Sequence, residues 1–150
     1  MAFNSWEMRG ETAMPEPFLV RLPTGGDLLE SIAEAFRRRS IRNGAFGVIG
    51  AVTKGVIGFF DHKTRQYINK ELEGVYEIVA CAGNISERDN DIFVHAHIVL
   101  SDEEFQCFGG HLMPGTVTFV GELHGMEVPG PVPIRTLRED IGLALWDEEP

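Results

Sequence analysis

The chain has 150 residues, of which 43% are hydrophobic and 24% are charged, and its formal net charge at pH 7 is −10. This length and composition predict one globular domain, and the negative charge disfavours nucleic-acid binding, which depends largely on basic residues that neutralise phosphates. No apolar run approaches the roughly 20 residues of a membrane helix, and the N-terminus lacks a signal-peptide layout. We therefore expect a cytoplasmic protein.

Residues 1–17 mix polar residues, glycine and proline without periodicity, which predicts a flexible N-terminal lead before a single domain of residues 18–150. Residues 18–22 predict a short strand that ends at a turn over residues 23–26. A helix is predicted directly afterwards, because Asp27 is a good N-cap and is followed three residues later by Glu30. Its apolar residues recur at helical spacing: Leu29, Ile32, Ala33 and Phe36.

Short strands are predicted to dominate from residue 45 onward, where the hydrophobic period approaches two. The predicted strands are 45–53, 56–61, 66–71, 74–84, 92–101, 106–109, 116–124 and 143–146. Glycines recur in the first two of them, which indicates bulges or a strongly coiled sheet. The proline-rich residues 128–133 predict a loop before a final hairpin or edge strand.

A basic cluster, Arg37–Arg39 with Arg42, closes the predicted helix. Cations at this end interact favourably with the helix dipole, so we interpret the cluster as structural rather than as a phosphate site. Cys81 and Cys107 lie in apolar stretches and form no CxxC motif, which predicts reduced thiols.

Three histidines form the strongest candidate site. His95 and His97 are two residues apart in a predicted strand, so they point to one face while the even-numbered apolar residues face the core. The glycines that precede His111 would allow a close approach or a positive φ, and so bring His111 over the other two rings. Three imidazoles on one side of a metal leave a position open for water or substrate. The pattern predicts a metal site; the alternative is that the rings only form hydrogen bonds across a sheet.

Two carboxylates are candidate companions of the histidines. Glu77 has apolar neighbours on its strand face, so it needs either a partner, such as a metal, a metal-bound histidine or an arginine of another subunit, or an edge position in water. Glu122 and His124 share a face of the predicted strand 116–124 and would join the same pocket. Asn84, after the Glu77 strand, is interpreted as a turn cap.

The sequence resembles the plant and prokaryote conserved (PPC) domain family over residues 18–146. The resemblance rests on Leu-Pro-Thr-Gly-Gly-Asp at 22–27, Gly-Val-Tyr-Glu-Ile at 74–78, Gly-Asn-Ile at 83–85, His-Ala-His at 95–97 and Phe-Gly-Gly-His-Leu at 108–112. It implies an α+β fold in which one main helix packs on a strongly bent antiparallel sheet, assembled as a homotrimer. It also implies that His95, His97 and His111 hold zinc or another divalent metal near the subunit interface.

Two functions follow from these observations. The first is a small cytoplasmic trimeric metalloprotein that binds a small molecule; if it is an enzyme of unknown substrate, Glu77 or Glu122 would serve as a proton shuttle. The second is a non-enzymatic oligomerisation or regulatory module with structural histidines. Family names often mention DNA binding, but the Arg-Gly-Arg-Pro AT hook of the plant relatives is absent from this sequence.

Overall fold

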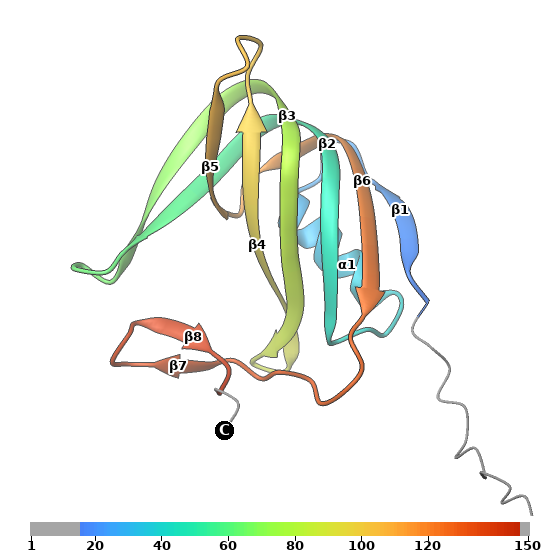
Figure 1. Ribbon diagram of the computed structural model, residues 1–150, viewed down its shortest axis with the longest axis vertical. Helices are drawn as coiled ribbons and strands as arrows, with labels where there is room; N and C mark the ends of the chain where they lie inside the picture. Colours follow the sequence, from blue (N-terminus) through green and yellow to red (C-terminus); the bar gives the residue numbers. More distant parts are fainter. Residues whose placement is uncertain (1–15, 148–150) are drawn as a thin grey trace, which may run out of the picture.

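The computed structural model of the protein describes residues 16–147, so residues 1–15 of the predicted N-terminal lead lie outside the described part of the chain. Eight strands and one helix follow one another in this part (Figure 1). They are β1 (Phe18–Leu22), α1 (Leu28–Arg37), β2 (Gly44–Asp61), β3 (Gln66–Arg88), β4 (Asp91–Ser101), β5 (Cys107–Leu112), β6 (Val117–Glu127), β7 (Thr136–Arg138) and β8 (Leu143–Leu145). Within this part no helix has the length and the apolar character needed to cross a membrane.

Six strands form one antiparallel sheet in the order β1-β6-β2-β3-β4-β5. The sheet curls on itself, because Ile57 and Gly58 near the end of β2 also pair with Leu112 and His111 of β5. Register shifts within β2 and its neighbours supply the bulges that this curvature needs, as the glycine-rich sequence predicted. The two remaining strands, β7 and β8, form a separate hairpin.

The expected α+β class is wrong, because the chain is mostly β and its sheet is barrel-like. The described part contains only one short helix, α1, of ten residues. The α+β class was implied by the family resemblance, and it gave one short helix the same rank as a sheet that makes up most of the described residues. The predicted strands in fact merge: 45–53 and 56–61 form the continuous β2, and 66–71 and 74–84 form β3.

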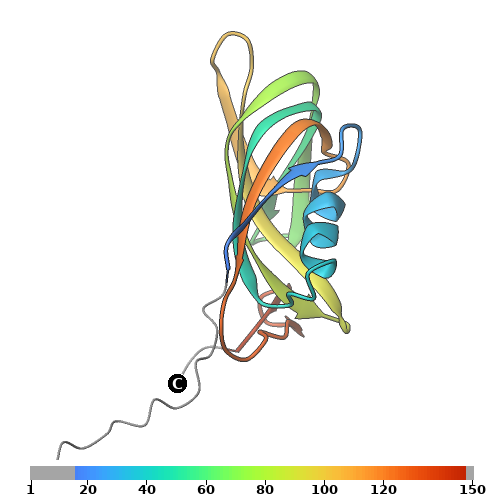
Figure 2. The same cartoon turned by 90° about the vertical axis from the view of Figure 1, so that its right-hand side faces the viewer.

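The predicted start of α1 is confirmed, since the side chain of Asp27 accepts a hydrogen bond of 3.0 Å from the Glu30 amide. The helix lies against one face of the curled sheet (Figure 2). Leu28, Ile32 and Phe36 are fully buried in the core that α1 shares with the sheet. The helix therefore covers one side of the core even though it contributes little to the secondary structure.

The arginines of the cluster form ion pairs with acidic neighbours, which is consistent with the structural interpretation. They are Arg37–Glu30 (3.2 Å), Arg37–Glu34 (2.9 Å), Arg38–Glu34 (2.7 Å) and Arg42–Glu87 (2.8 Å). The Arg39 side chain donates to the carbonyl oxygen of Ala35. Acidic side chains therefore offset much of the positive charge of this exposed cluster.

Candidate metal centre

The three histidines lie side by side on adjacent strands. His95 and His97 belong to β4, and His111 belongs to β5, where it is the direct pairing partner of His97. The predicted alternation along β4 is confirmed, because Ala96 and Ile98 are buried in the core while the histidines point to the opposite face. One atom from each ring can be chosen so that all three atoms lie within 4.8 Å of one another.

The position of His111 depends on the glycine that precedes it. Of the two possibilities that the sequence left open, a positive φ is not adopted by Gly109 or Gly110, and both residues lie within β5. The predicted close approach is confirmed at Gly110, because an added Cβ atom would lie 2.8 Å from the carbonyl oxygen of Gly58. The absence of a side chain at this position allows β5 to pack against β2, and this contact places His111 beside His97.

Burial keeps two of the rings in the neutral form. Desolvation lowers the pKa of His95, and the neighbouring Arg135 and His97 lower it further. Desolvation and the neighbouring His95, His97 and Arg135 lower the pKa of His111 to about 4. Both imidazoles are therefore uncharged at pH 7, and the neutral imidazole is the form that binds metal ions. The donor set thus fits a divalent cation.

Arg135 is the residue of this region that the sequence did not point to. It precedes β7, where its amide donates a hydrogen bond of 2.7 Å to the Glu87 carbonyl oxygen. Its guanidinium Nη2 lies 3.5 Å from Nδ1 of His95, and it stacks against the rings of Phe93 and Trp146. No periodicity or motif in the sequence marks this arginine, because it follows a proline-rich loop. It comes close to His95 only when its segment packs beside β3 in the folded protein.

The other predicted companions lie away from the three histidines. Glu77 is opposite Ser101, four residues along β4 from His97, which corresponds to roughly 13 Å of strand. Glu122 and His124 are exposed on β6, which is separated from β4 by β2 and β3, or about 14 Å across the sheet. Within one chain the structure therefore brings none of the three to the cluster.

Asn84 does not cap a turn, as we had interpreted it, but lies within β3. It is the direct partner of His95, and its side-chain oxygen accepts a hydrogen bond of 3.2 Å from Arg135 Nη2. Asn84 thereby connects the arginine to the strand next to the histidines.

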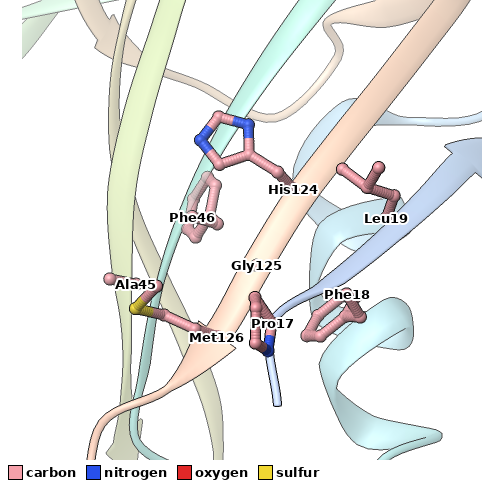
Figure 3. A pocket seen from close by; sticks show the side chains of 8 residues that line it. All are labelled: Pro17, Phe18, Leu19, Ala45, Phe46, His124, Gly125 and Met126. Carbon is pink, nitrogen blue, oxygen red and sulfur yellow. The ribbon is translucent and has the colours of Figure 1, made fainter. Parts of the chain in front are cut away.

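An apolar groove lies elsewhere on the sheet, away from the three histidines. This apolar groove of about 420 Å³ is formed by β1, β2 and β6 (Figure 3). Its lining residues are Pro17, Phe18, Leu19, Ala45, Phe46, His124, Gly125 and Met126. The lining residues Leu19 and Met126 are 83% and 47% exposed and the nearby Ile49 is 54% exposed, so this part of the surface is unusually apolar.

Comparisons with known proteins agree with this fold. Residues 9–129 match the model of the Plants and Prokaryotes Conserved (PCC) domain. A metal-containing protein from Archaeoglobus fulgidus is 35% identical, with a TM-score of 0.83 over 89% of this chain and 94% of that one. A plant- and prokaryote-conserved (PPC) protein from Pyrococcus horikoshii is 33% identical, with a TM-score of 0.86 over 95% and 99%.

A third structure, of a candidate DNA-binding protein from Bacteroides thetaiotaomicron, is 25% identical, with a TM-score of 0.79 over 87% of this chain and 91% of that one. No curated protein matches the sequence.

Proposed function

Since the chain belongs to the Plants and Prokaryotes Conserved (PCC) domain family, we propose that it is a small trimeric protein that binds a divalent metal through His95, His97 and His111. The observation that carries this proposal is the cluster itself, in which three imidazoles from two adjacent strands offer donor atoms within 4.8 Å of one another. The similar protein from Archaeoglobus fulgidus, which is described as metal-containing, supports it.

Zinc is the first candidate for the metal, because imidazole nitrogens suit it and three protein ligands leave one position open. When bound, such an ion would polarise a substrate carbonyl or lower the pKa of a bound water. The three histidines would hold the ion and leave one of its coordination positions free. An enzymatic role would need a proton shuttle other than Glu77 or Glu122 of the same chain. Glu77 is opposite Ser101, four residues along β4 from His97, and Glu122 lies on β6, three strand spacings from β4.

Elemental analysis of protein purified without an affinity tag tests the metal proposal. We expect about one divalent ion per chain. The exposed His97 can be replaced at little cost in stability, so His97→Ala should lower the metal content strongly while the melting temperature of the metal-free protein changes little. His62→Ala, in the exposed turn between β2 and β3, is the matched control and should keep the metal. A folded protein that holds no metal and takes up no added Zn²⁺ near pH 7 would overturn the proposal.

The proposed trimer is supported by the apolar surface around the groove. Exposed apolar side chains of this size, at Leu19, Ile49 and Met126, are usual where a protein meets a partner, and here a second copy of the chain would cover them. Light scattering should give a mass three times that of one chain, and Ile49→Glu should dissociate the trimer. A monomeric wild-type protein at micromolar concentration would exclude this assembly.

We propose no DNA-binding role, despite the name of the relative from Bacteroides thetaiotaomicron. The net charge is −10, and the arginine cluster is engaged in ion pairs with its own helix and neighbouring strands. A binding assay over a range of salt concentrations decides between the two functions. Micromolar or tighter binding near physiological salt, falling steeply as salt rises, would favour the regulatory module instead.

We place the protein in the cytoplasm. Cys81 and Cys107 are both free, as expected for a reducing compartment.

A further inference from the structure

The guanidinium of Arg135 is a buried charge whose hydrogen-bond partners among residues 16–147 are all neutral. The residue is only 6% exposed, yet within residues 16–147 it forms no ion pair. Its Nε donates to the Ser86 hydroxyl at 2.8 Å, Nη1 donates to the Ala144 carbonyl at 3.1 Å, and Nη2 donates to the Asn84 side chain at 3.2 Å. Burying such a charge without a counter-ion is costly in free energy. A buried, unpaired charge of this kind is common at sites where a bound ligand supplies the opposite charge.

The charge lies beside the histidine cluster. Nη2 is 3.5 Å from Nδ1 of His95, so the guanidinium borders the space that the three rings enclose. The imidazoles bring no negative charge, and no described carboxylate belongs to the cluster. A divalent ion at the histidines, together with Arg135, would therefore place three positive charges in one partly buried region. An anion that contacts both the ion and the guanidinium would offset this charge.

The donor count limits the kind of anion. A guanidinium has five N–H groups, and the three neutral acceptors use one each. At most two N–H groups of Arg135 remain, on Nη1 and Nη2. This number suits one oxygen of a carboxylate whose second oxygen faces the metal, whereas a phosphate presents three or more oxygens that need donors.

We propose that Arg135 and the open side of the three-histidine site together bind the carboxylate group of a small molecule. This inference rests on the proposed metal site and adds the chemical class of its ligand. Arg135 would hold the carboxylate in a fixed orientation, with the remainder of the molecule directed toward the exposed side of His97. The stacking of Arg135 on Phe93 and Trp146 keeps the guanidinium in place before the ligand arrives.

The test uses full-length protein loaded with Co²⁺, whose visible spectrum changes when a ligand of the metal is exchanged. Acetate and inorganic phosphate are titrated separately at constant pH and ionic strength. We expect acetate to change the spectrum of the wild-type protein. Arg135→Lys, which keeps the charge but loses the planar donor pair, should bind acetate at least ~10-fold more weakly, the lower end expected for a hydrogen bond to a charged group.

A second variant remains informative if Arg135 variants fail to fold. Asn84→Asp has nearly the same shape and places a carboxylate where Arg135 Nη2 already donates, so it should satisfy the charge internally and weaken acetate binding by a similar factor. Elemental analysis of each sample separates the two proposals, because absence of bound metal contradicts the metal site alone. Bound metal with equal acetate affinity in all variants would overturn the carboxylate site, and so would tighter binding of phosphate than of acetate.

Discussion

The replacement of Phe36 by alanine tests whether helix α1 is essential to the mostly β fold. The Phe36 side chain is fully buried, and its ring centroid lies 5.1 Å from that of Phe18 and 6.0 Å from that of Phe46. Phe36 therefore connects α1 to β1 and β2. Truncation of a buried phenylalanine costs about 3–5 kcal/mol, because apolar contacts are lost and a cavity remains. For a chain of this length each kcal/mol lowers the melting temperature by roughly 2–4 °C.

Calorimetry at one fixed protein concentration measures this effect, since assembly would otherwise change the melting temperature. We expect Phe36→Ala to melt roughly 6–20 °C below the wild type. Phe59→Ala is the control: its side chain is 66% exposed, and its loss should cost about 1 kcal/mol or less. Equal shifts for the two variants would refute the conclusion that α1 completes the core, and would mean that the curled sheet is stable without it.

Three further outcomes are expected. Asp27→Ala should destabilise the protein by about 0.5–2 kcal/mol in urea unfolding, because Asp27 caps α1 and also accepts a hydrogen bond of 2.7 Å from the Gly115 amide. Asp27→Asn should lose less stability, and equal losses for the two variants would contradict the capping role. At pH 8 a thiol reagent should modify Cys107 but not Cys81, whose pKa burial raises to about 12; two reactive thiols in the native protein would count against this packing. Gly110→Ala should weaken metal binding although all three histidines are present. The control Gly109→Ala should not weaken it, because the Cβ atom added there meets other atoms only at 3.4 Å. Equal metal affinities of the two variants would show that the close approach of β5 is unimportant.

Local patterns of the sequence predicted the positions of the helix and most strands well, whereas the expected α+β fold class was wrong. Asp27 and the helical spacing that follows it identified α1, because capping and periodicity depend only on neighbouring residues. The continuity of β2 across Lys54 and Gly55 was not predicted, since the bulge between Val52 and Lys54 interrupts the alternation without ending the strand. The second pairing of β2, with β5, is a property of the curled sheet and has no local pattern in the sequence.

The candidate site shows the same division. The shared face of His95 and His97 follows from strand geometry, and the glycine before His111 indicated a close approach. Glu122 also lies on an outward face, but the order of the strands places β2 and β3 between it and the histidines. Arg135 comes from a different part of the chain, and only the pairing of its segment with Glu87 brings it to the site.

The first strand of the described residues pairs with one far along the chain, since Phe18 of β1 is opposite Gly125 of β6. Such distant contacts form only after a long loop has closed, and chains rich in them fold in milliseconds to seconds rather than microseconds. During synthesis β1 leaves the ribosome early but has no partner until β6 has been made. The hairpin of β2 and β3, whose strands are neighbours in sequence, can form much sooner. We therefore expect the N-terminal strand to be the last to join the sheet, and a nascent chain that lacks β6 to expose the partner surface of β1.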